Sequence, residues 1–185
     1  LGEGIKGSLR VGAVNSLGLY LLSPLVGTFL KHNPKVKLSL VYAEGPEILR
    51  ALQKGELDVA ILPDVEQEFG KDPGELEARP LLKDEIWLVA SSRALTAPSS
   101  ISLKDLEDQP IAVLRGEYPG FDQRFQEALR TGGVKLTPTF ETNNTGTLKK
   151  VIESGLGWGF VPSHSVRKQV RAGRLAIIEV PELKY

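Results

Sequence analysis

Apolar residues in the first half of the chain follow two spacings in turn, one typical of strands and one typical of helices. Residues 9–14 form a largely apolar run that predicts a buried strand, and apolar residues then recur at helical spacing over 17–30. Residues 36–42 alternate with period two, a helix is expected from Gly45-Pro46 to Gly55, and 57–62 predicts a third strand. This order, with short connections, predicts right-handed crossovers and a parallel sheet covered by helices.

A second series of the same kind follows residues 91–101, a stretch rich in Ser, Ala, Thr and Pro that predicts a crossover between lobes. Ser102 to Asp105 resembles a capping sequence for a short helix, and Ser163 is expected to cap a helix that ends at Ala172. The other expected elements are strands at 78–82, 85–90, 111–114, 138–141, 158–161 and 175–180, and helices over 121–129, closed by Gly132-Gly133, and from the turn at 143–145 to Gly155.

These elements predict an α/β protein of two Rossmann-like lobes that follow one another along the chain. A crossover strand near 85–90 and a return near 174–180 would join the two lobes. We therefore expect lobe I to comprise residues 1–90 and 173–185, and lobe II to comprise residues 91–172.

Composition narrows the possible functions of the chain. Its 185 residues carry 23 Lys and Arg against 23 Asp and Glu, and without long runs of like charge a broad nucleic-acid-binding face is not expected. The absence of cysteine excludes disulfides, thiolate metal sites and thiol nucleophiles. No apolar stretch is long enough to span a bilayer, and no signal segment opens the chain. The opening residues, L-G-E-G-I-K-G without an initiator Met, are typical of the end of a linker and suggest an excised domain.

Asn15 and Ser16 are the first candidates for a ligand site. They follow the expected strand at 9–14 and precede the expected helix, a place where free N–H groups and the positive end of the helix dipole favour ligands in α/β sheets. Both residue types also cap helix N-termini, so simple capping without a ligand is the alternative.

Asn143, Asn144 and Thr145 repeat this arrangement in the second lobe. They follow one expected strand and begin the next expected helix, with amide and hydroxyl groups at its N-terminus. Two such helix starts that face each other would form a polar clamp, although plain capping is an alternative here too.

Three further residues are candidates of second rank. Ser91 and Ser92 lie at the expected crossover, and Arg115 follows the strand at 111–114. The guanidinium of Arg115 could bind a carboxylate as a fork, or it could extend into solvent.

Other chemistry is sparse. His32 and His164 have no metal-ligand partner at i+4, so both are expected at the surface, and neither a metal nor a cofactor is predicted. The sequence leaves a Ser-His-Asp arrangement open but contains no G-x-S-x-G elbow. Gly155, Gly157 and Gly159 lie between a helix and a strand, which reverses the order of a dinucleotide-binding loop, and are expected to allow a close approach of the strand to its neighbour or to a ligand.

Six short stretches together suggest a family. They are G-S-L-R-V-G-A at 7–13, Y-L-L-S-P-L at 20–25, G-E-L-D-V-A-I at 55–61, S-L-K-D-L at 102–106, E-T-N at 141–143 and G-L-G-W-G-F-V-P at 155–162. Each is weak alone, but in this order and spacing across nearly the whole chain they are specific. The chain resembles the effector-binding domain of a LysR-type transcriptional regulator, which implies a type 2 periplasmic-binding-protein fold whose two lobes enclose a small molecule.

The resemblance also implies a function. It matches Ser16 to a frequent ligand contact of the first lobe, and the full set of expected effector-binding residues is Ser16, Asn15, Ser92, Arg115, Asn143, Asn144 and Thr145. It further implies a non-enzymatic, cytoplasmic domain that forms head-to-tail homodimers within a tetramer. DNA would be bound only through an N-terminal winged helix-turn-helix that this chain lacks, and members of the family usually continue past the last strand into one more helix.

The identity of the effector stays open at this point. Neutral polar groups at helix N-termini suit a small anion or a carboxylate, while the neighbouring Trp158 and Tyr118 leave aromatic acids possible. Two other functions are alternatives. A solute-binding protein of a transporter is disfavoured by the missing signal segment, and an enzyme on the same fold would need a reactive group in the cleft.

Overall fold

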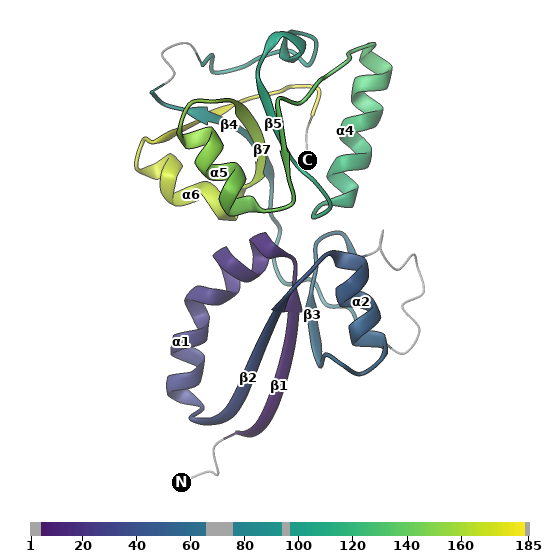
Figure 1. Ribbon diagram of the computed structural model, residues 1–185, viewed down its shortest axis with the longest axis vertical. Helices are drawn as coiled ribbons and strands as arrows, with labels where there is room; N and C mark the ends of the chain where they lie inside the picture. The colour runs from purple at the N-terminus through teal and green to yellow at the C-terminus, as the bar shows by residue number, and fades with distance from the viewer. Residues whose placement is uncertain (1–4, 66–75, 94–96, 184–185) are drawn as a thin grey trace. The chain divides into compact units, whose positions relative to one another are not determined.

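The chain divides into two compact units, Leu1–Arg79 and Pro80–Tyr185, and the computed structural model describes residues 5–65, 76–93 and 97–183 of them (Figure 1). Both units are α/β, as predicted. The predicted boundaries place 80–90 and 173–185 with the first unit, whereas the strands of these segments are hydrogen-bonded into the sheet of the second. The structure therefore differs from the predicted boundaries at these two segments.

Unit 1 contains a three-stranded parallel sheet of order β2-β1-β3, which confirms the parallel pairing predicted for this half. The strands are β1 (Lys6–Ala13), β2 (Lys35–Tyr42) and β3 (Val59–Ile61). Helix α2 (Gly45–Gln53) packs on β1 and β3, because Ile48 enters a small core with Val14 and Leu57. Gly55 ends this helix with a φ of 71°, a left-handed conformation that glycine adopts without strain.

Arg10 and Asp58 fasten β1 to the turn before β3. The Asp58 carboxylate accepts hydrogen bonds from the Arg10 backbone N–H at 2.8 Å, from Nε at 3.1 Å and from Nη2 at 2.7 Å. These bonds lower the pKa of Asp58 to about 2, so the pair stays charged at neutral pH.

The helix after β1 is longer and less regular than its sequence predicts. Helical residues begin at 15, continue through the π-helix η1 (Leu17–Leu22) and end in α1 (Ser23–His32). The predicted helix over 17–30 is confirmed, but its π-helical part has no counterpart in the hydrophobic pattern. His32 at the end of α1 is exposed, as predicted, and its Nδ1 lies 2.8 Å from the Thr28 carbonyl oxygen.

Unit 2 contains a five-stranded sheet of order β6-β5-β7-β4-β8. Strand β5 is parallel to β6 and β7, whereas β4 is antiparallel to β7 and β8. The strands are β4 (Ile86–Ser91), β5 (Ile111–Leu114), β6 (Phe140–Thr142), β7 (Trp158–Pro162) and β8 (Leu175–Ile178), and the helices are η2 (Asp105–Asp108), α4 (Pro119–Gly132), α5 (Thr145–Glu153) and α6 (Ser163–Arg171).

One predicted strand is wrong. Residues 78–82 have no regular structure, and Leu81 and Leu82 are exposed. Pro80 interrupts this stretch, and a proline has no N–H to donate to a neighbouring strand. The predicted strand therefore pairs with no described neighbour.

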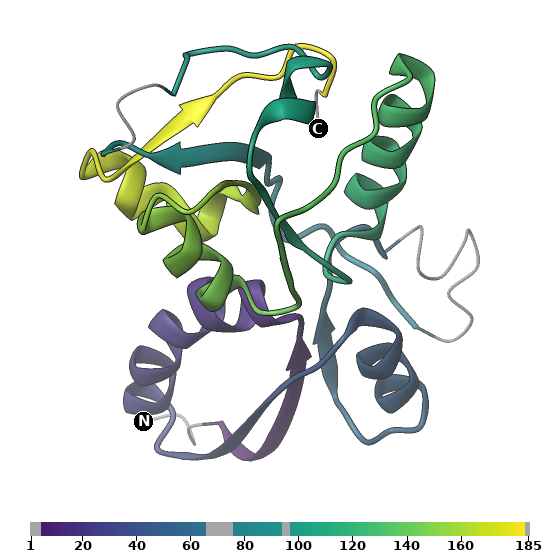
Figure 2. The ribbon, with the colours of Figure 1, turned by 45° about the horizontal axis from the view of Figure 1, so that its top comes forward.

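Two consecutive residues of β7 explain the layers of unit 2. Successive side chains of a strand point to opposite faces of the sheet. On one face, Gly159 leaves room for Ile152 of α5; on the other, the Phe160 ring contacts Phe121 and Phe125 of α4, with ring centroids 5.4 and 4.9 Å away. The two ribbon views accordingly show α5 and α6 on one side of the sheet and α4 on the other (Figures 1 and 2). The predicted role of Gly159 in a close approach is confirmed.

Asp84 fastens the segment before β4 to the first turn of α6. Its carboxylate accepts hydrogen bonds from the Ser163 hydroxyl at 2.5 Å and from His164 Nδ1 at 2.6 Å. Burial by itself would raise the pKa of Asp84, but these bonds and the Glu85 backbone N–H bring the pKa below its usual value. The carboxylate is therefore ionised at neutral pH.

This cluster corrects two predictions. The side chain of His164 is only 9 % exposed, so its predicted surface location is wrong; the Asp84 carboxylate compensates its burial. The helix cap predicted at Ser163 is also wrong, because Pro162 occupies the cap position and the Ser163 hydroxyl binds Asp84 instead.

We predict that Gly159→Ala destabilises unit 2. The added Cβ would lie 2.5 Å from Ile152 Cδ1 and 3.2 Å from the Ala112 carbonyl oxygen. Because the second neighbour is backbone of the adjacent strand, the free energy of unfolding should fall by about 1–3 kcal/mol. Urea denaturation followed by circular dichroism measures this change. Gly27→Ala, at a helical position where a Cβ meets nothing within 4 Å, is the control and should leave stability unchanged or raised. Equal stability of the two variants would contradict the prediction.

We also predict that Asp84→Asn lowers stability at neutral pH by about 1–3 kcal/mol, since hydrogen bonds to an ionised group are lost. The pKa of Asp84 is lower in the folded chain than in the unfolded chain. Asp84 therefore makes its full contribution to the free energy of unfolding above the ordinary Asp pKa, and this contribution is lost as the pH falls through the pKa of Asp84 in the folded chain. Urea denaturation at a series of pH values should therefore show that the free energy of unfolding falls less steeply toward acid pH in the variant than in the wild type. The exposed Asp108→Asn variant should retain the wild-type decline.

Candidate functional site

The polar edge of unit 1 lies where β1 ends and the following helix begins. Asn15 and Ser16 occupy this position, as predicted, and Ser16 is fully buried. Neither residue acts as the expected helix cap: both are already helical, and Ser16, with φ −64° and ψ −45°, makes no capping bond with its side chain. The Oδ1 atom of Asn15 is buried and has no hydrogen-bond partner among the described residues.

The polar edge of unit 2 is set by three parallel strands. Because β5, β6 and β7 run in the same direction, their carboxyl ends and the N-termini of α4, α5 and α6 share one edge of the sheet. Asn144 is the cap of α5, since its Oδ1 accepts the Thr147 backbone N–H at 2.9 Å and the Thr147 hydroxyl at 3.2 Å. The capping interpretation is therefore confirmed for Asn144, whose Nδ2 group is not used in this cap.

The two neighbours of Asn144 differ in exposure. Asn143 is exposed, whereas Thr145 is fully buried at the first position of α5. The Thr145 hydroxyl donates to Glu117 Oε1 at 3.3 Å, and Glu117 is itself only 5 % exposed. Thr145 therefore joins α5 to the loop after β5.

Arg115 lies on the same edge, directly after β5. Its backbone N–H donates to the Thr142 carbonyl, and its guanidinium donates to Glu141 Oε1 at 2.6 Å, both side chains being about half exposed. Arg115 is thus neither buried nor fully solvated, and an incoming carboxylate would compete with Glu141 for it. An exposed pair of this kind is weak enough to be exchanged.

Ser91 and Ser92 are not brought to this edge. Strand β4 is antiparallel to β7, so its carboxyl end lies at the end of the sheet opposite to the N-terminus of α5. The Ser91 hydroxyl accordingly donates to the carbonyl of Glu153, the last residue of α5, and the backbone of exposed Ser92 binds Arg174. Within unit 2, Ser92 is therefore separated from Asn143, Asn144 and Thr145.

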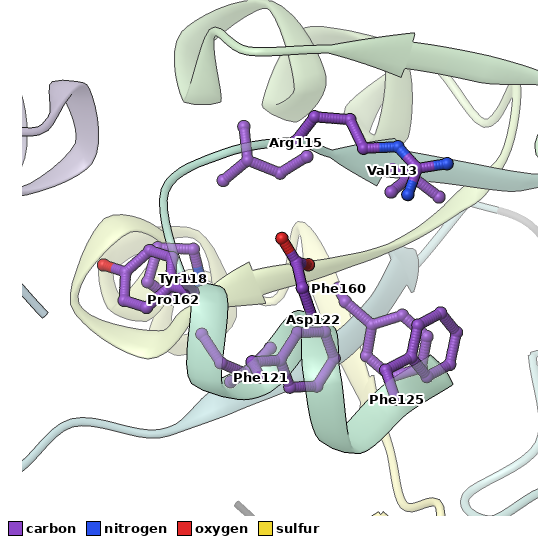
Figure 3. A pocket seen from close by; sticks show the side chains of 10 residues that line it. Val113, Arg115, Tyr118, Phe121, Asp122, Phe125, Phe160 and Pro162 are labelled. Carbon is purple, nitrogen blue, oxygen red and sulfur yellow. The ribbon is translucent and has the colours of Figure 1, made fainter. Parts of the chain in front are cut away.

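A small cavity of about 20 Å³ opens beside Arg115, lined mainly by aromatic and aliphatic side chains (Figure 3). A volume of this size holds about one water molecule. Asp122 points its carboxylate into it, toward the side where Arg115 lies (Figure 3). Tyr118, one of the two aromatic residues singled out in the sequence, also lines the cavity, whereas Trp158 does not.

The environment of Asp122 changes its acidity. Burial among the aromatic rings raises its pKa above the usual value, although the Arg115 charge and the Gly116 backbone N–H oppose this effect. The sequence did not lead to Asp122 as a candidate site residue. The signal that could have pointed to it is a carboxylate that stands between Phe121 and Phe125 of a predicted helix.

The geometry offers little for catalysis or metal binding. Ser163 and His164 both donate to Asp84, so the Ser163 hydroxyl is not directed to the imidazole as a Ser-His-Asp nucleophile would be. Over residues 5–65, 76–93 and 97–183, no three His, Asp or Glu side chains come together as metal ligands would. No helix in the same ranges has the length and apolar character needed to cross a membrane.

The LysR substrate binding domain family model matches residues 2–185, nearly the whole chain. A similar curated protein is the uncharacterized HTH-type transcriptional regulator YwqM of Bacillus subtilis, which is 28% identical over 171 residues, covering 91% of this chain and 56% of YwqM. The chain thus spans little more than half the length of this relative.

Two solved structures show the same fold. The regulatory domain of Synechocystis CcmR in complex with 2-PG has a TM-score of 0.74 and 21% identity, covering 97% of this chain and 83% of that one. The effector-binding domain of QuiR in complex with shikimate has a TM-score of 0.73 and 18% identity, covering 98% and 84%. They support the predicted periplasmic-binding-protein-like fold, and the match of the family model over residues 2–185 establishes that the chain belongs to the LysR substrate-binding domain family.

Proposed function

We propose that this chain is the part of a transcription regulator that binds a small-molecule effector through polar groups of both units. One observation supports this proposal: in each unit a parallel strand is followed directly by polar residues at the start of the next helix. These residues are Asn15 and Ser16 in unit 1 and Asn143 to Thr145 in unit 2. Ligands of open α/β sheets bind at such carboxyl ends. The effector complexes of two structural neighbours support the same function.

The proposed effector is a small anion or carboxylate. Helix N-termini favour negative charge, and Arg115 can exchange its exposed partner Glu141 for a ligand carboxylate. Shikimate, which is bound in the QuiR structure, is a small carboxylate. Ser92 is left out of the proposed site because it lies at the other end of the unit 2 sheet.

The proposed mechanism is a population shift. An effector that contacts both units stabilises the arrangement in which it binds best, and only this difference in affinity can change the protein's conformation. The chain covers 56% of YwqM, an HTH-type regulator, and we place DNA binding in a segment outside this chain. As a transcription regulator, the whole protein is proposed to act in the cytoplasm.

We further propose that the domain forms homodimers through unit 1. Helix α1 carries Val26, Phe29 and Leu30, yet none of its residues is buried, and Leu25 is 59% exposed. An apolar helix surface left uncovered in a single chain is typical of an interface between copies.

A thermal-shift screen of inorganic anions and small carboxylates, shikimate included, tests effector binding. A ligand that raises the melting temperature of the wild-type chain should raise that of Ser16→Ala and Asn143→Ala by clearly less, with affinity lower by about three- to tenfold for each lost hydrogen bond. Ser154→Ala removes a hydroxyl from the other end of α5 and serves as the control. Equal stabilisation of the wild type and both site variants would place the ligand elsewhere.

Sedimentation velocity tests the dimer. Leu25→Glu places a charge on the uncovered face of α1 and should convert dimers into monomers at micromolar concentration, because an unpaired charge is costly in an apolar interface. Gly27→Glu adds the same charge about 200° around the helix, given its 100° per residue, and should leave the dimer intact. A wild-type chain that is monomeric at every accessible concentration would contradict the interface.

A further inference from the structure

The helix that carries Asn15 and Ser16 contains a π-helical turn directly after them. In η1 the carbonyl oxygen of Gly18 accepts the backbone N–H of Ser23, five residues later, whereas Gly18 N–H still bonds to the Val14 carbonyl in the ordinary α pattern at 2.9 Å. A π turn holds one more residue than an α turn, and such turns are frequent at functional sites. Its place between the candidate residues and α1 therefore calls for a physical cause.

Pro24 explains why an α-helical turn is disfavoured here. It lies inside the helical stretch 15–32, where proline lacks the N–H that would bond to the Tyr20 carbonyl and its ring would collide with that carbonyl. A widened turn ahead of Pro24 relieves this conflict without ending the helix.

Three contacts fix the widened turn in place. The Ser23 hydroxyl donates to the Gly18 carbonyl at 2.9 Å, and its oxygen lies 2.8 Å from the Tyr42 hydroxyl. The Tyr42 ring packs directly against the Cα of Gly18, so that a Cβ at this position would overlap the ring. Ser23 thus satisfies the π-turn carbonyl with both its backbone and its side chain.

The same contacts connect the turn to the strands beneath it. Tyr42 is the last residue of β2 and pairs with Ala13, the last residue of β1, two residues before Asn15. The pairing of β2 with β1 therefore fixes the Tyr42 ring relative to the end of β1, the strand that leads to Asn15 and Ser16.

We propose that Gly18, Ser23 and Tyr42 are positioning residues that hold the π turn and so determine which side chains of the first helical turn reach the effector. This inference rests on the proposed function of Asn15 and Ser16. Loss of the extra residue would shift the register before α1 by one position, a rotation of about 100°. Such a rotation would move the Ser16 hydroxyl away and bring an apolar neighbour, Leu17, toward its place.

The register of the turn can be measured without a ligand. Through-hydrogen-bond scalar couplings in the deuterated wild-type chain should connect the Ser23 amide nitrogen to the Gly18 carbonyl carbon. In Ser23→Ala and Tyr42→Phe, amide exchange of residues 22 and 23 should quicken about three- to tenfold for each lost hydrogen bond. Ser154→Ala, which removes a similar bond from a hydroxyl to a helix carbonyl in unit 2, should leave these amides unchanged.

The effect on the site is read from binding of shikimate, sulfate and phosphate by calorimetry. A probe that binds the wild type should bind Ser23→Ala several-fold more weakly, although Ser23 touches no ligand in this proposal, and Ser23→Thr, which keeps the hydroxyl, should restore the affinity. A coupling from Ser23 to Leu19 in the wild type, or unchanged exchange and affinity in Ser23→Ala, would overturn the inference. A wild type that binds none of the probes would contradict the proposed effector class, while the couplings and exchange rates would still decide whether Ser23 and Tyr42 hold the turn.

Discussion

Parallel strand pairing is the constraint on which the candidate site depends. Strands that run in the same direction must be connected by a chain segment that returns to the starting edge, and in both units helices do this. As a result, every parallel strand ends on the same edge of its sheet, where the next helix begins with unbonded N–H groups. Polar residues stand at these positions in both units: Asn144 caps its helix, whereas Ser16 makes no capping bond with its side chain. The two interpretations of such residues, as caps and as ligand contacts, therefore have one physical origin, and the structure separates them only where a capping bond is made, as at Asn144.

Buried polar groups then fasten the loops around this edge. Thr145 binds the buried Glu117, and Ser163 and His164 share the carboxylate of Asp84. In each case a segment without regular structure is joined to the first turn of a helix, so that the helix start is held from two directions. A buried polar atom without a partner is costly, and these bonds give partners to the Thr145 and Ser163 hydroxyls and to His164 Nδ1. Each edge nevertheless keeps such an atom without a partner in the described part of the chain, Asn15 Oδ1 in unit 1 and His164 Nε2 in unit 2.

The sequence predicted the elements well where local pattern decides them. The strand at 111–114 agrees with β5 to the residue, because four buried apolar residues are followed directly by Arg115 and Gly116. The glycines at 55, 133 and 155 were expected to end helices, and all three have positive φ values. Prediction failed where a distant partner decides the outcome. Residues 78–82 were predicted as a strand but pair with no described neighbour, and the His164 side chain is buried against Asp84, 80 residues away, to which its Nδ1 donates a hydrogen bond. Ser92 was named as a candidate from its place at the expected crossover, and because β4 runs opposite to its neighbour β7, Ser92 is separated from Asn143 within unit 2.

The π turn shows why the orientation of a site is harder to predict than its position. Hydrophobic spacing placed Asn15 and Ser16 at the start of a helix, which the structure confirms, but their rotation about the helix axis depends on how many residues the following turn contains. Pro24 gives a local reason for an irregular turn, whereas Tyr42, brought over Gly18 by the pairing of β1 with β2, is a contact that only the folded sheet provides. An extra residue in one turn rotates the side chains before it by about 100° relative to those after it. The identity of the residues at such a site is therefore a local property of the sequence, while the direction in which they point is a property of the whole unit.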